Sequence, residues 1–140
     1  NDTTAPYEGI EALLERLHAA GVRLAIVSNK NDPNVKALAR DYFSRWIGLA
    51  VGEQEGVRRK PAPDTVLMVM REWACDPATV LYVGDSGVDV ETAHNAGVDC
   101  AAVCWGFRSE DELRAAGPTA LFHSPGQLGD YILGEISEKR

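Results

Sequence analysis

The sequence contains few cysteines, no long hydrophobic run and no opening signal peptide, and each absence narrows what the protein can be. Its three cysteines are odd in number and form no Cys-x-x-Cys pair, which favours reduced thiols over disulfide bridges. No apolar run approaches the roughly 20 residues that span a membrane. We therefore expect a cytoplasmic protein without a membrane partner.

Positive charge is also scarce. The 140 residues include 14 Lys and Arg against 21 Asp and Glu, which gives a formal net charge of -7. A protein that binds duplex DNA or RNA needs a basic face to replace counterions, so we exclude nucleic acid as a partner. An acidic balance is typical of a protein that handles cations, or that binds small anions through a metal or a local basic group.

The metal-binding residue types give no pattern of their own. Cys100 and Cys104 fall within an apolar run, and the histidines, His18, His94 and His123, lie in separate predicted elements. No metal-ligand spacing connects them. We therefore expect these cysteines and histidines to be structural or surface residues and not ligands.

Apolar residues alternate between two patterns along the chain. Ile10, Leu13, Leu14 and Leu17 follow helical spacing, whereas residues 24–27 form a short continuous apolar run that is typical of a strand buried on both faces. With 45% hydrophobic residues and no internal linker, residues 1–140 predict a single α/β domain with a three-layer, mostly parallel, doubly wound sheet. Further helices are expected near 35–42, 66–73 and 88–96 and after capping boxes at Ser109 and Ser124, and further strands near 49–51, 80–83, 100–104 and 120–122.

Polar side chains follow the predicted strands, where ligands bind in an open parallel sheet. Ser28 and Asn29 follow the first strand, Lys60 lies in the basic loop after the second, and Asp85 and Asp89 follow the strand at 80–83. A hydroxyl and a lysine can bind phosphate oxygens, and carboxylates can bind Mg²⁺. The set predicts a site for phosphoryl chemistry, in which the protein positions groups and neutralises charge.

Each of these residues also has a plainer interpretation. Ser28 could be a turn serine, Lys60 a solvated loop lysine, and Asp85 and Asp89 could cap or complement the helix that follows them. Because all of them are expected at one edge of the sheet, a shared site is the better explanation.

Three segments in this order resemble motifs of the haloacid dehalogenase superfamily. They are Val27-Ser28-Asn29, Arg59-Lys60-Pro61-Ala62-Pro63 and Gly84-Asp85-Ser86-x-x-Asp89, which are similar to its second, third and fourth motifs. Residues 103–113 resemble the phosphoglycolate phosphatase branch, and the resemblance extends from Pro6 to Leu133. It implies a Rossmann-like core and a magnesium-dependent phosphatase, a hydrolase that acts through an aspartyl-phosphate on a small phosphorylated metabolite such as phosphoglycolate.

The resemblance also implies a role for each site residue. Ser28 would bind a phosphoryl oxygen, and Asn29 would add a backbone N–H or its side chain. Lys60 would neutralise charge on the phosphoryl group and on the nucleophile. Asp85 would be a direct Mg²⁺ ligand, and Asp89 would support the metal site.

The superfamily's first motif, Asp-x-Asp, which supplies the nucleophile, does not occur in the sequence. The cap domain has no counterpart either, so we expect a partial core domain that has little or no turnover alone. In the superfamily the missing strand lies between the strands that end here at Val27 and Val83. We expect those strands to pair directly, a second chain to supply a strand, or a missing N-terminal segment to have supplied it; an open gap would contradict these expectations.

Two alternatives remain open at this stage. The fold could serve a sugar-phosphate mutase or another phosphatase of the superfamily, because the cap that decides the substrate is not in this sequence. The domain could also be non-catalytic and bind Mg²⁺ or phosphate, or act as a receiver-like phosphoacceptor at Asp85.

Overall fold

The structure, a computed structural model, describes residues 4–104 and 110–139. Helices and strands alternate along the chain as the sequence predicts, and the boundaries differ from the prediction by a few residues. No described helix is long and apolar enough to cross a membrane. In chain order the elements are α1 (Thr4–Ala19), β1 (Leu24–Asn31), α2 (Asp32–Tyr42), β2 (Ile47–Glu53), α3 (Asp64–Trp73), the 3₁₀ turn Pro77–Thr79, β3 (Leu81–Gly84), α4 (Gly87–Ala96), β4 (Asp99–Val103), α5 (Glu110–Ala115), β5 (Ala120–Phe122) and α6 (Pro125–Lys139).

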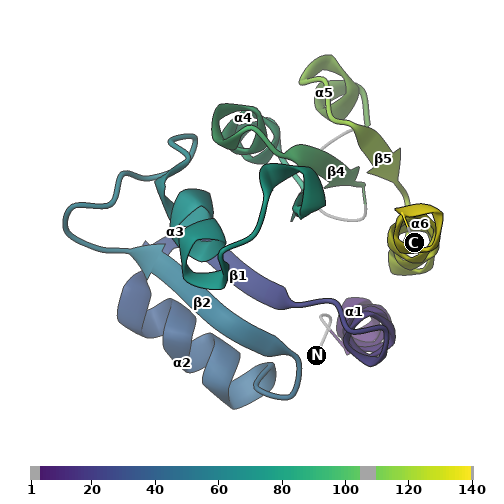
Figure 1. Ribbon diagram of the computed structural model, residues 1–140, viewed down its shortest axis with the longest axis horizontal. Helices are drawn as coiled ribbons and strands as arrows, with labels where there is room; N and C mark the ends of the chain where they lie inside the picture. The colour runs from purple at the N-terminus through teal and green to yellow at the C-terminus, as the bar shows by residue number, and fades with distance from the viewer. Residues whose placement is uncertain (1–3, 105–109, 140) are drawn as a thin grey trace.

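Successive residues of the strands pack against opposite layers of helices, as the two-residue period of a strand requires. In β4, Cys100 packs with α3 and α4, whereas Ala101 and Val103 pack with α1 and α6. In β1, Val27 packs with the α3 and α4 cluster, and Ile26 packs with α2 on the other face. Figure 1 shows α2 and α3 on opposite sides of β1 and β2. The predicted three-layer α/β fold is confirmed.

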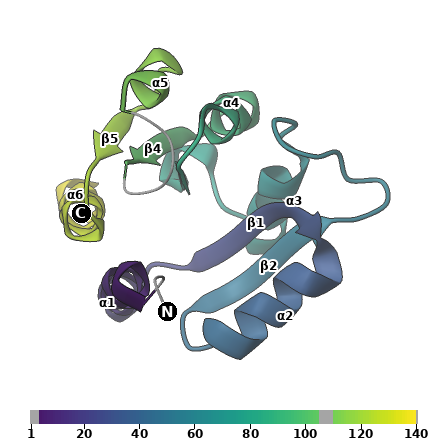
Figure 2. The same cartoon turned by 180° about the vertical axis from the view of Figure 1, so that it is seen from behind.

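The sheet is divided into two parts. β1 pairs with β2, and β3, β4 and β5 pair in that order, all in parallel. The edges of β1 and β3 face a cleft of about 1020 Å³ that is lined by residues 24–27 and 81–85 and by apolar side chains of α1, α3 and α6. Figure 2 shows the β1–β2 pair and the part of the sheet that holds β4 and β5 as separate ribbons. The expected direct pairing of the two strands is therefore wrong, because a cleft and not a row of hydrogen bonds lies between them.

Helices on both faces connect the two parts of the sheet. On one face Leu24 of β1 and Leu81 of β3 pack with the same cluster, which includes Leu13 of α1. On the other face Val27 of β1 and Tyr82 of β3 share a cluster with α3 and α4. The two parts are thus joined through helices on both faces and not by hydrogen bonds between β1 and β3. Whether another segment or chain supplies a strand remains a prediction.

Strand β1 runs further than the sequence suggests. Its pairing with β2 is regular from Ala25 to Val27 and resumes only at Asn31, opposite Glu53. Residues 28–30 therefore lie in an irregular stretch near the end of the strand and not beyond it.

The N-cap of α6 agrees with the prediction, since the Ser124 hydroxyl accepts a hydrogen bond from the backbone N–H of Gln127. The expected capping box at Ser109 lies outside the described residues.

Gly52 of β2 is a position where a side chain does not fit. A Cβ there would lie 2.5 Å from the carbonyl oxygen of Lys30 and 2.7 Å from a methyl carbon of Val35. We expect Gly52→Ala to destabilise the fold by about 1–3 kcal/mol, because the core would be overpacked. Urea unfolding followed by circular dichroism measures this change.

Gly48→Ala in the same strand is the matched control, because a Cβ there would meet nothing closer than 3.6 Å. Its effect should stay within about 0.5 kcal/mol. Equal losses of stability in the two variants would contradict the packing at Gly52.

Candidate functional site

The five site residues named from the sequence line one cleft of about 550 Å³ at the carboxyl edge of the strands. Each side of the gap contributes, since Ser28 and Asn29 come from β1, and Asp85 and Asp89 come from the end of β3 and the start of α4. The complete lining is Ser28, Asn29, Lys30, Arg59, Lys60, Asp85, Ser86, Val88 and Asp89.

Asp89 is the centre of the hydrogen-bond network. Its Oδ1 accepts hydrogen bonds from Lys60 Nζ at 2.9 Å and from the Tyr82 hydroxyl at 2.8 Å. Its Oδ2 accepts from the backbone N–H of Asp85 at 3.1 Å and from the Ser86 hydroxyl at 3.0 Å. Because both oxygens are committed, Asp89 supports the site through its neighbours.

Gly84 allows this carboxylate to approach the backbone. A Cβ at Gly84 would collide with the Asp89 side chain. Ser86 then caps α4, and its hydroxyl accepts a hydrogen bond from the backbone N–H of Asp89 at 3.3 Å. The Gly-Asp-Ser-x-x-Asp spacing therefore places Asp89 in the first turn of α4, beside the end of β3.

The electrostatics of the network hold Asp89 in its charged form. Burial alone would raise the pKa of Asp89, but the hydrogen bond and positive charge of Lys60 and the hydrogen bonds of Tyr82 and Ser86 outweigh burial and lower it. Burial, followed by the nearby Asp89 charge, raises the pKa of Tyr82 well above its ordinary value. Tyr82 thus stays a neutral donor.

Lys60 is fixed from both sides of the gap. Its backbone N–H donates to Asn29 Oδ1 of β1 at 2.8 Å, while its ammonium reaches Asp89 in α4. The next residue, Pro61, accepts a hydrogen bond from Asn95 Nδ2 of α4 at 2.9 Å. The Asn29 side-chain oxygen is therefore engaged in positioning Lys60, which the sequence did not indicate.

Ser28 and Asp85 keep groups free for a ligand. The Ser28 oxygen accepts a hydrogen bond from the Lys30 backbone N–H at 3.1 Å, which leaves the hydroxyl hydrogen available to donate. Asp85 is exposed, and within residues 4–104 and 110–139 its carboxylate has no hydrogen bond or ion pair. An exposed carboxylate in an oxygen-lined cleft is the donor type that Mg²⁺ prefers.

Sequence reasoning missed Tyr82 and Asn95. Tyr82 sits within a run that reads as buried strand, but a buried hydroxyl needs a partner, and that requirement was the available signal. Asn95 lies near the end of α4, where only the tertiary fold brings it to the Lys60 loop. No sequence signal could have found it.

Comparison with known proteins identifies the class of protein that this fold and site define. The haloacid dehalogenase-like hydrolase family matches residues 1–103, so the chain belongs to that family. A crystal structure from Lactobacillus delbrueckii subsp. bulgaricus, described as a candidate phosphoglycolate phosphatase, has a TM-score of 0.85 and 38% identity. The match covers 89% of this chain and 52% of that one.

Three bacterial phosphatases with curated names are also similar to this chain. The phosphoglycolate phosphatase of Pseudomonas putida is 31% identical over 125 residues, covering 86% of this chain and 45% of the relative. Phosphoglycolate phosphatase 1 of Pseudomonas aeruginosa is 35% identical, with 84% and 44% covered. N-acetylmuramic acid 6-phosphate phosphatase of the same organism is 31% identical, with 91% and 57% covered. The chain thus spans about half the length of the curated relatives it matches.

Asp89→Asn tests the network. It leaves the Lys60 ammonium, on a side chain only 16% exposed, without a charged partner, and should cost about 3 kcal/mol at neutral pH. Folding lowers the pKa of Asp89 from its ordinary 3.8, so this contribution is present above about pH 4 and is lost as the pH falls through the folded pKa. The variant should therefore show a shallower acid dependence of the unfolding free energy.

Urea unfolding between about pH 2 and pH 7 measures both effects. Asp111→Asn, at an exposed position in α5, is the control and should leave the acid dependence unchanged. An Asp89→Asn protein that is as stable and as acid-sensitive as the wild type would contradict the proposed network.

Proposed function

We propose that this chain carries the phosphate-binding and metal-binding part of the active site of a magnesium-dependent phosphomonoesterase that acts on phosphoglycolate. The observation that carries the proposal is the convergence of Ser28, Lys60 and Asp85 on one cleft. Membership of the haloacid dehalogenase-like hydrolases and the similarity to phosphoglycolate phosphatases support the same conclusion.

The available groups suit a phosphate monoester. The Ser28 hydroxyl hydrogen can be donated to a phosphoryl oxygen. The Lys60 ammonium has three donors, of which Asp89 uses one, so it can also contact the phosphoryl group and offset its charge. Asp85, supported by the Asp89 network, would hold Mg²⁺, which supplies positive charge to the phosphoryl oxygens when bound.

The nucleophile must come from elsewhere, because no Asp-x-Asp occurs in the sequence. We propose that a strand bearing this motif fills the cleft between β1 and β3, contributed by another part of a longer protein or by a second chain. Such a strand would pair with the unpaired edges of β1 and β3, and its carboxyl end would emerge between Ser28 and Asp85. The chain alone should then bind phosphate but turn over little or no substrate.

A sugar phosphate is the second candidate substrate. The relative N-acetylmuramic acid 6-phosphate phosphatase is about as similar to this chain as the phosphoglycolate phosphatase of Pseudomonas putida. Both substrates are phosphomonoesters, so the cleft described here suits either one. Once a strand with Asp-x-Asp has been supplied, the rates at which the protein hydrolyses phosphoglycolate and a sugar phosphate decide between the two substrates.

Phosphate binding can be tested on the chain as it is. Isothermal titration with inorganic phosphate in the presence of Mg²⁺ should detect binding, and Lys60→Met should weaken it about 10-fold or more, because a charge-assisted contact is lost. Lys36→Met is the matched control, since Lys36 pairs with Asp32 outside the cleft. Equal binding by both variants would contradict the assignment of Lys60.

Complementation tests the catalytic proposal. We would add a peptide in which a short run of β-branched residues is followed by Asp-x-Asp, or co-express such a segment with this chain. Either should produce magnesium-dependent release of phosphate from phosphoglycolate. Asp85→Asn should abolish this activity, as expected for loss of a metal ligand. If the complemented protein binds phosphate but never hydrolyses an ester, the enzyme proposal fails and a binding role replaces it.

A further inference from the structure

The ends of β4 and β5 bring together two residues that are far apart in the sequence. The two strands are parallel, and their last register pair is Val103 with Phe122. The next residues are Cys104 and His123, so they emerge as neighbours at the same edge of the sheet. The backbone N–H of Cys104 donates to the carbonyl oxygen of Phe122 at 2.8 Å, which continues the pairing to this point.

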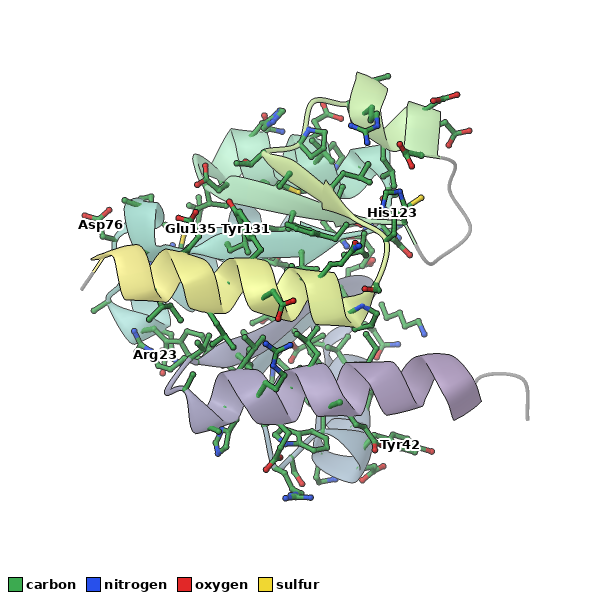
Figure 3. All side chains as sticks on the ribbon, turned by 90° about the vertical axis from the view of Figure 1, so that its right-hand side faces the viewer. Arg23, Tyr42, Asp76, His123, Tyr131 and Glu135 are labelled. Atoms are coloured by element: carbon green, nitrogen blue, oxygen red, sulfur yellow. The ribbon has the colours of Figure 1, made fainter. Side chains whose placement is uncertain are left out.

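Glu110, the first residue of α5, completes the group. Its Oε1 lies 2.5 Å from Nε2 of His123. One ligand atom from each of Cys104, Glu110 and His123 falls within 4.8 Å of the other two. Figure 3 shows His123 at the end of β5, at one end of the sheet.

We propose that Cys104, Glu110 and His123 form a zinc site. A thiolate, an imidazole and a carboxylate are the donors that Zn²⁺ takes, and three protein ligands leave a fourth, tetrahedral position for water. With zinc–ligand bonds of about 2.0–2.3 Å, ligand atoms lie about 3.5 Å apart. The ligand atoms of the three groups already lie within 4.8 Å of one another, and the metal would replace the hydrogen bond between Glu110 and His123.

Neighbouring groups already orient two of the ligands. Arg114 donates to Glu110 Oε2 at 2.7 Å, which leaves Oε1 directed at His123. The backbone N–H of His123 donates to Gln127 Oε1 at 2.9 Å, which fixes the start of α6 beside the site.

The zinc site shares no residue with the cleft that holds the proposed magnesium site. Its ligands follow β4 and β5, whereas Asp85 follows the neighbouring strand β3. Its sulfur and nitrogen donors favour Zn²⁺ over Mg²⁺, and the oxygen donors of the other cleft have the opposite preference. A zinc ion here would join the ends of β4 and β5 to the start of α5.

Cobalt substitution tests the proposal directly. Co²⁺ titrated into the reduced protein should produce a sulfur-to-cobalt charge-transfer absorption in the near ultraviolet, which Zn²⁺ displaces and Mg²⁺ does not. Cys104→Ser should remove this absorption. His123→Ala should weaken zinc binding by more than about 100-fold, because even loss of an outer hydrogen-bond partner costs about 10- to 100-fold.

The chain offers matched controls. Cys75→Ser changes another half-buried thiol, and His18→Ala changes another exposed histidine, and neither should affect the cobalt spectrum. Zinc should also raise the melting temperature of the wild type and of both controls but not of Cys104→Ser or His123→Ala.

Two results would overturn the proposal: a wild-type protein without the charge-transfer absorption, or an absorption that survives both ligand substitutions. If Cys104→Ser does not fold, Glu110→Gln replaces it, and the thermal shift with zinc should then disappear. Because these readouts involve neither phosphate nor Asp85, they are independent of the outcome for the proposed phosphatase.

Discussion

The ion pair between Lys60 and Asp89 is the interaction on which the rest of the site depends. Lys60 follows β2, and Asp89 lies in α4 after β3, so the pair joins two parts of a sheet that share no strand hydrogen bonds. Asn29 holds the backbone of the same lysine from β1. Removing either partner would leave an uncompensated charge in a half-buried place, so the pair fixes the two parts of the site relative to each other.

The remaining connections between the two parts are apolar and lie on the faces of the sheet. In Figure 3, α1 and α6 run side by side across one face, and both belong to the cluster that contains Leu24 and Leu81. Helices α3 and α4 hold the other face through Val27 and Tyr82. The unpaired edges of β1 and β3 are thereby kept apart at a distance that side-chain packing sets. A strand that entered between them would find backbone partners on both sides.

The order of helices and strands, and the residues of the cleft, could be predicted because they follow from local rules. Parallel strands end at one edge, so Ser28, Lys60 and Asp85 had to converge there once the strands were recognised. The place where the sheet divides was predicted from the missing first motif, but no local pattern showed that β1 and β3 would stay unpaired. The cluster of Cys104, Glu110 and His123 was missed because its members have no ligand spacing in the sequence. It arises from the register between β4 and β5, which no local pattern encodes.

The commitment of Asp89 to four donors has a consequence for metal binding. Of the two carboxylates in the fourth motif, Asp85 is then the one that remains free, and Mg²⁺ requires about six oxygen ligands. Water can supply some of them, but one protein carboxylate holds the ion weakly. A strand with Asp-x-Asp would add carboxylates at the same point, and phosphate would add further oxygens. Binding of the strand, the metal and the phosphate should therefore be mutually reinforcing, and by thermodynamic linkage each strengthens the others by the same factor.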